Sequence, residues 1–165
     1  MNNCYLDAEA VITFFRITGR KHIFITGSRG SGKSHLVNDM LKHMSDSFNL
    51  LQSHRTDTPQ VVIKSNLVAD NKEFMIGVPR TSGINPASKG NNMTIIEDGF
   101  INCAIPAIDT HLDTTPERLF VIDELGYLES SCIPFQKAVE KLLDNSHVLA
   151  VIRKQSTCLL YTSPS

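Results

Sequence analysis

One stretch restricts the possible folds of this chain more than any other: Gly27-Ser28-Arg29-Gly30-Ser31-Gly32-Lys33-Ser34. It matches the pattern G-x-x-x-x-G-K-[ST]. A short apolar run over 23–26 precedes it, and apolar residues at helical spacing follow it over 36–44. In that setting the backbone N–H groups of the loop form a concave anion site, and the next helix adds the positive end of its dipole. The stretch therefore predicts a phosphate-binding loop between a strand and a helix.

The residue types in the loop match the chemistry of a nucleotide with Mg²⁺. Lys33 is expected to reach the β- and γ-phosphates, and the Ser34 hydroxyl is expected to bind Mg²⁺. Glycine is needed where the backbone takes a positive φ or approaches phosphate closely. The predicted nucleotide-binding residues are Gly27, Ser28, Arg29, Gly30, Ser31, Gly32, Lys33, Ser34 and His35. A Gly/Ser-rich surface loop is the alternative, but plain turns do not need Gly-Lys-Ser at a helix start.

A second acidic motif follows another apolar run. The residues over 119–122 predict a short buried strand, and Asp123 and Glu124 stand at its carboxyl end. Ligands of open α/β sheets bind at the carboxyl ends of strands, so a parallel neighbour of the first strand would bring Asp123 to the phosphate loop. Asp123 is then expected to hold Mg²⁺, and Glu124 to orient or deprotonate an attacking water as the catalytic base. A solvated acidic turn is the alternative.

Length and charge limit the class of protein. A chain of 165 residues with 41% hydrophobic and 20% charged residues suits one α/β domain with a sizeable core. A formal net charge of −1 gives no bulk electrostatic case for binding nucleic acid or an anionic membrane. No apolar run approaches the length of a membrane span. Acids at Asp7 and Glu9, without a basic region, argue against a secretory signal.

The cysteines indicate a reducing compartment. Cys4, Cys103, Cys132 and Cys158 are scattered and form no C-x-x-C pair. This pattern argues against a zinc site and against a disulfide scaffold, and it predicts a cytoplasmic protein.

Periodicity and turn residues predict the order of elements. A helix is expected over 6–18, and a strand buried on both faces over 21–26. A hairpin is expected from strands 60–68 and 73–78 around a turn at 70–72. The further expected elements are a strand at 50–53, a loop at 81–92, a strand at 93–97, a helix at 99–112 kinked or started at Pro106, a strand at 118–124, a helix at 131–145 and a strand at 148–152.

The last residues call for separate treatment. The octapeptide over 158–165 resembles the translation of a transposon-end sequencing adapter, so it is excluded from the fold prediction. The expected organisation is a single domain over 1–157 with a non-native tail over 158–165. On this interpretation the natural domain is truncated at its C-terminus.

The segments 23–36 and 119–130 resemble a small nucleoside-triphosphatase family first described in thermophiles and in a human cancer-related homologue. That family has a strand ending in Asp-Glu, then a branched apolar residue, Gly, a variable residue, an apolar residue and Glu, as over 123–129 here. A Ser and a Phe-led helix follow, which Ser131 and Phe135 match. The loop differs from the family's usual Pro-Gly-Val-Gly-Lys-Thr, and Thr58-Pro59-Gln60 lacks the acid of a Thr-Pro-Glu-like stretch.

The resemblance implies a RecA-like P-loop fold. The expected architecture is therefore a three-layer α/β fold with a mostly parallel central sheet, and the hairpin predicted from the residues over 60–78 is an insertion in its middle. It also implies hydrolysis of ATP, GTP and other nucleoside triphosphates to diphosphate and phosphate. Lys33 and Ser34 carry over as the phosphate and Mg²⁺ groups, Asp123 as the metal-associated acid and Glu124 as the base. Glu129 carries over as a motif position without an assigned role.

Two other functions stay open at this point. A nucleotide or nucleoside kinase shares the loop but needs an acceptor pocket, and usually an Arg-rich lid that the 79–92 segment lacks. A non-catalytic ATP-binding switch would act on an unidentified protein partner. For hydrolysis, Arg80, Arg118 and Arg153 are the candidates for stabilising transition-state charge, and the sequence alone does not place them.

Overall fold

The computed structural model describes residues 21–27, 32–44, 48–80 and 93–153. Seven strands of this described part form one sheet in the order β1-β7-β6-β2-β3-β4-β5. Their bounds are β1 His22–Gly27, β2 Phe48–Arg55, β3 Val61–Ser65, β4 Phe74–Pro79, β5 Met93–Ile95, β6 Leu119–Leu125 and β7 His147–Arg153. The pairs β1–β7, β7–β6 and β6–β2 are parallel, whereas β2–β3, β3–β4 and β4–β5 are antiparallel. Five strands therefore run in one direction, and only β3 and β5 oppose them.

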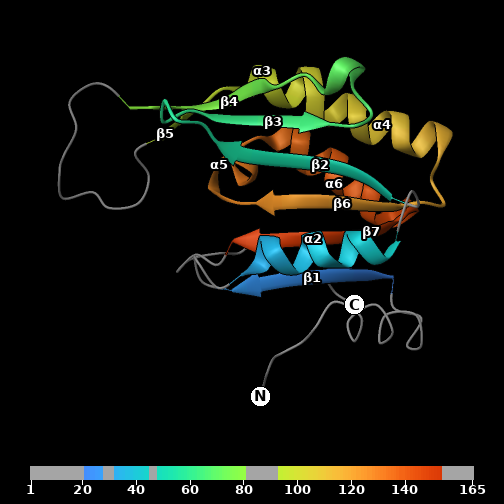
Figure 1. Cartoon of the computed structure of the whole chain (residues 1–165). Helices are drawn as coiled ribbons and strands as arrows, with labels where there is room; N and C mark the ends of the chain where they lie inside the picture. Colours follow the sequence, from blue (N-terminus) through green and yellow to red (C-terminus); the bar gives the residue numbers. More distant parts are fainter. Residues whose placement is uncertain (1–20, 28–31, 45–47, 81–92, 154–165) are drawn as a thin grey trace.

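Helices cover both faces of the sheet and make three layers (Figure 1). Helix α2 (Lys33–Met44) lies on one face, over β1 and β7, and the chain from α3 (Glu97–Gly99) to α4 (Ile105–Thr114) lies on the other with α6 (Ile133–Asn145). The short helix α5 (Tyr127–Ser130) follows β6.

Side chains of the central strands point to the two faces of the sheet in turn, so each face has its own hydrophobic core. On β6, Phe120 and Ile122 pack with α4 and α6, whereas Leu119 and Val121 pack with α2 residues. Side chains of a strand point to opposite faces in turn, so a continuous apolar strand fills both cores. The run over 119–122 is therefore buried on both sides, as its composition predicts.

The hairpin insertion predicted for the middle of the chain is present. Strands β3 and β4 pair antiparallel, and the turn between them contains a single 3₁₀ turn, Ala69–Asn71. Asp70 and Asn71 take positive φ values of 60° and 51°, which Asp and Asn tolerate better than most residues. These two residues lie in the predicted turn.

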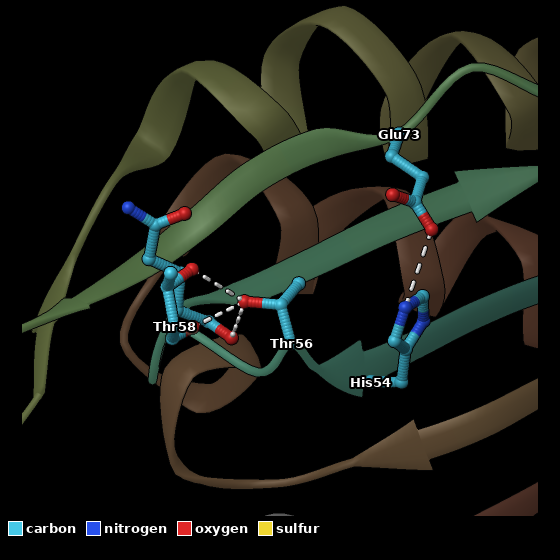
Figure 2. A network of polar contacts seen from close by, with 5 residues as sticks. His54, Thr56, Thr58 and Glu73 are labelled. Carbon is cyan, nitrogen blue, oxygen red and sulfur yellow. Dashed lines mark hydrogen bonds and ion pairs between the residues drawn. The ribbon is translucent and has the colours of Figure 1, made fainter.

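Strand β2 reaches β3 through a turn held by threonine side chains (Figure 2). The Thr56 hydroxyl donates to the Thr58 carbonyl oxygen, and the Thr56 N–H donates to the Gln60 carbonyl oxygen at 2.8 Å. Beside this turn, His54 Nε2 lies 3.2 Å from Glu73 Oε2 and joins the end of β2 to the residue before β4.

Two sequence predictions need correction. The helix expected over 99–112 already begins at Glu97 and is π-helical over Phe100–Ala104 before it continues through Pro106 to Thr114. Proline has no N–H and clashes with the preceding turn of a regular helix, and a π segment accommodates such an irregularity. The helical run therefore begins ahead of Pro106, whereas the regular helix α4 starts at Ile105 with Pro106 in its first turn, close to the predicted start.

Strand β1 was expected to be buried on both faces as a central strand. It is instead the end strand of the described sheet, paired with β7 alone, and Phe24 on it is 37% exposed. Apolar composition does not separate an edge strand from a central one. The predicted helix over 6–18, the loop over 81–92 and the tail over 158–165 lie outside the described residues.

Candidate active site

The loop motif lies at the carboxyl end of β1 and the start of α2. Gly27 ends the strand, and Gly32 precedes the helix with φ 89°, a conformation that glycine adopts without strain. The Leu36 N–H donates to the Gly32 carbonyl oxygen at 2.9 Å, which closes the first helical turn. Ser28, Arg29, Gly30 and Ser31 lie outside the described residues. The strand and the helix predicted on either side of the motif are therefore confirmed.

The first turn of α2 carries the other predicted loop residues. Lys33, Ser34 and His35 are its first three residues, so their backbone N–H groups lie at the positive end of the helix. The His35 side chain is 84% exposed and pairs with Asp39, with Nε2 3.7 Å from Oδ2. The His35 side chain thus faces solvent along the helix.

Asp123 lies beside this helix start although its strand is not the neighbour of β1. Strand β7 separates β6 from β1, and the parallel order still brings the three carboxyl ends to one edge. The Ser34 hydroxyl lies 3.4 Å from Asp123 Oδ1. The two residues that the sequence predicts for Mg²⁺ are therefore in contact across 89 residues of chain.

Burial controls the charge of Asp123. Desolvation raises the pKa of this carboxyl above its usual value, and the nearby Glu124 charge raises it further. Hydrogen bonds from Ser34 and Gln52 and the charge of Lys33 act in the opposite direction. A buried carboxylate among such groups gains most from a cation placed next to it.

Gln52 is a site residue that sequence reasoning missed. It lies on β2 directly opposite Asp123 on β6, and its side chain hydrogen-bonds to the Asp123 carboxylate. A glutamine in a half-buried strand carries no motif, so only the register between β2 and β6 reveals its position.

Glu124 lies at an irregularity of β6. On β7, Val151 is opposite Asp123 and Ile152 is opposite Leu125, so Glu124 is the extra residue of a bulge. Bulges redirect side chains and are common next to active sites. Glu124 Oε1 lies 3.6 Å from Arg153 Nε, and the two side chains are 27% and 44% exposed.

The turn after β6 is held by Glu129. The Gly126 N–H donates to Glu129 Oε1 at 2.9 Å, which caps the short helix α5. Glu129 is only 6% exposed. Burial raises the pKa of its carboxyl to about 7, against the effect of the backbone N–H groups of Gly126 and of Glu129 itself. The Glu129 carboxyl therefore fixes the backbone of the turn at Gly126, close to Glu124.

The described residues fit a magnesium ion bound together with phosphate. Ser34 and Asp123 present two hard oxygen donors 3.4 Å apart. No group of three or more His, Cys, Asp or Glu residues able to hold a metal occurs in the described part of the chain. Mg²⁺ is commonly bound through one or two protein oxygens plus substrate phosphates and water, rather than in an all-protein cage.

The protein-family comparison assigns this arrangement to a known group. The model of a family described as NTPase matches residues 22–163, which include both the loop and the β6 motif. The chain belongs to this NTPase family. Membership identifies the protein as a nucleoside triphosphate hydrolase.

Two solved structures share the fold. THEP1 from the hyperthermophile Aquifex aeolicus aligns with a TM-score of 0.63 at 18% identity, over 83% of this chain and 79% of its own. A human cancer-related nucleoside triphosphatase aligns with a TM-score of 0.62 at 18% identity, over 86% of this chain and 80% of its own. These neighbours confirm the predicted α/β P-loop NTPase fold with its mostly parallel sheet. A sequence comparison with curated proteins gives no match.

The NTPase fold also separates the three candidate arginines. Arg118 precedes β6 and therefore lies at the edge opposite the loop, whereas Arg80 follows β4 and Arg153 ends β7. Arg153 pairs in register with Gly27, the first glycine of the loop, and is the one that contacts Glu124.

In the described residues no helix is both long and apolar enough to cross a membrane.

Proposed function

We propose that this NTPase hydrolyses nucleoside triphosphates, ATP and GTP among them, with Mg²⁺ bound at the carboxyl ends of β1, β7 and β6. Lys33 and the loop amides would bind the phosphates, Ser34 and Asp123 would hold the metal, and Glu124 would be the base. The contact between Ser34 and Asp123 carries this proposal, because it joins the two halves of the motif in one place.

The chemistry assigned to the chain is transfer of the γ-phosphoryl group to water. The bond between the γ-phosphorus and the β–γ bridging oxygen breaks, a bond to the water oxygen forms, and the water proton passes to Glu124. Bound Mg²⁺ supplies positive charge for the phosphate oxygens. Lys33 and the amides at the start of α2 stabilise the charge that develops on the same oxygens.

The placement of the two neighbouring acids supports separate roles. Asp123 is 5% exposed and faces Ser34. Glu124 is the bulged residue, is partly exposed and faces Arg153. A base must meet water, so the more accessible carboxyl is the better candidate.

Cys103 and Cys132 are free and buried, which agrees with a cytoplasmic location.

The test is phosphate release from ATP, GTP and CTP with Mg²⁺. Wild type is compared with Lys33→Ala and Glu124→Gln, and exposed residues of the same types supply the controls Lys42→Ala and Glu140→Gln. We expect both site variants to lose at least about 100-fold in kcat, since each removes a group aimed at the reacting phosphate. Unchanged release in both site variants would exclude this edge as the catalytic site.

Further arms of the assay distinguish the alternatives. Release that depends on Mg²⁺ and stops with a chelator supports the metal assignment. Transfer of phosphate to an added nucleoside, rather than to water, would indicate a kinase. Tight nucleotide binding without any release would indicate a switch that acts through a protein partner.

A further inference from the structure

Arg153 has a position that the motifs do not explain. It is the last described residue of β7, the strand between the loop strand β1 and the acidic strand β6. In the β1–β7 register it lies opposite Gly27, where the phosphate loop begins. The Arg153 cation therefore lies on the strand between Gly27 and Glu124.

The contact with Glu124 is loose enough to exchange. The distance of 3.6 Å from Nε to Oε1 exceeds that of a good hydrogen bond, and both side chains are partly exposed. Breaking a pair of this kind costs at most about fivefold in an equilibrium constant. A phosphate anion that carries more charge than one carboxylate can therefore displace Glu124.

The stem of Arg153 is kept near the site by its neighbours. A Cβ placed on Gly126 would lie 3.7 Å from Arg153 Cδ and 3.8 Å from its Cβ, so the side chain passes in ordinary contact distance of this turn. The Gly126 N–H is in turn held by the buried Glu129. The pairing of β7 with β1 on one side, and the turn that Glu129 holds at Gly126 on the other, restrict the positions that the Arg153 guanidinium can take.

We propose that Glu124 and the γ-phosphate of the bound nucleotide compete for the guanidinium of Arg153. Pairing with Glu124 keeps the base turned toward Arg153. When the γ-phosphate takes the guanidinium, Glu124 becomes available to the attacking water, and Arg153 gains a contact that a diphosphate cannot supply. This inference rests on the proposed function and assigns the sensing of the γ-phosphate to one residue.

The first readout is binding rather than turnover. Affinities for a β,γ-imido triphosphate and for ADP are measured by fluorescence titration with Mg²⁺ at fixed salt. Arg153→Ala is expected to weaken triphosphate binding by about 10- to 100-fold with little effect on ADP, since charge-assisted hydrogen bonds to phosphate are lost. Arg153→Lys retains the charge without the planar guanidinium, so its affinity for the triphosphate is expected to lie between those of wild type and Arg153→Ala.

The second readout tests the competition itself. Glu124→Gln is expected to tighten triphosphate binding about two- to fivefold, because the guanidinium no longer has to leave a carboxylate. In an Arg153→Ala background the same substitution should give no such gain. This double-mutant cycle separates exchange of Arg153 from a general effect of removing one negative charge.

Arg118→Ala is the matched control, since it changes an arginine at the opposite edge of the sheet and should leave both affinities unchanged. An unaltered triphosphate-to-ADP ratio in Arg153→Ala, with normal dependence on Lys33, would overturn this proposal alone. An equal gain from Glu124→Gln in both backgrounds would overturn the competition. Equal triphosphate binding by wild type and Lys33→Ala would overturn the proposed function, and this inference with it.

Discussion

Replacing His111 with Leu is expected to destabilise the protein without touching the active site. His111 is fully buried on α4, with Nδ1 2.8 Å from Asn49 Nδ2 and Nε2 2.7 Å from Ser146 Oγ. An amide nitrogen can only donate, so Nδ1 must accept and Nε2 must carry the proton. The Ser146 hydroxyl accepts this hydrogen bond and donates its own to the Pro116 carbonyl oxygen at 2.8 Å.

The magnitude follows from what leucine leaves behind. It fills a similar volume, but one buried N–H of Asn49 loses its acceptor, which costs about 1–3 kcal/mol. The edge-on contact with Phe120, with ring centroids 4.9 Å apart, is lost as well, and such pairs contribute about 0.5–1.5 kcal/mol. We expect a loss of about 2–4 kcal/mol, which corresponds to a melting temperature lower by about 5–15 °C.

The pH dependence provides an independent check. Burial lowers the pKa of His111 below its usual value, and the Arg118 charge also lowers it, whereas Glu117 raises it. The unfolded chain therefore binds this proton more readily, so the contribution of His111 is complete above pH 6.5 and declines as the pH falls below it. The stability difference between wild type and His111→Leu should shrink from pH 8 to pH 5.

Urea unfolding followed by circular dichroism at each pH measures both effects. Thr114→Ala on an exposed turn of α4 is the control and should stay within about 0.5 kcal/mol of wild type. The reasoning is refuted if His111→Leu costs less than about 0.5 kcal/mol at pH 8, or if its cost does not change with pH. Other titrating histidines, His22 among them, cancel in the difference.

Three further substitutions test the structure. Gly99→Ala should destabilise by about 1–3 kcal/mol in urea unfolding, because the new Cβ would clash with the Met75 carbonyl oxygen of β4; a neutral or stabilising result would contradict the packing of α3 on β4. Glu129→Gln should remove a pH dependence: the pKa of the buried carboxyl is raised from 4.5 to about 7, so wild type loses up to about 3 kcal/mol of stability as the pH rises between these two values. The variant should therefore gain stability relative to wild type at pH 8.5 but not at pH 5, and parallel pH profiles would be inconsistent with a buried acid. His54→Gln should change the free energy of unfolding by less than about 1 kcal/mol, because its pair with Glu73 is 42% and 47% exposed, and a larger loss at low salt would show that the pair is stronger than its exposure implies.

Local patterns in the sequence were sufficient to predict where the residues of the proposed site lie in the fold. Lys33 and Ser34 belong to a loop whose spacing is itself the signal, and Asp123 and Glu124 follow an apolar strand directly. Parallel strands carry their ligands at their carboxyl ends, so two such motifs predict one shared edge without knowledge of the strand order. The contact between Ser34 and Asp123 agrees with that prediction.

Residues that act through register could not be predicted in the same way. Gln52 reaches Asp123 because β2 pairs with β6, and Arg153 reaches Glu124 because β7 lies between β1 and β6 and β6 bulges at Glu124. Each is a polar residue without a motif. The strand order depends on which surfaces pack best in the whole chain, and a single sequence does not display that choice.

The phosphate loop and the acidic strand end were thus determined by the sequence itself, since both depend on short spacing and on the alternation of apolar residues. The tertiary structure decided which strand separates them, that β1 is the end strand of the described sheet, and which of the three arginines contacts Glu124, the proposed base. Local spacing is set by backbone geometry within a few residues. Strand order and register are set by packing between segments far apart in the chain, and these contacts exist only once the sheet has formed.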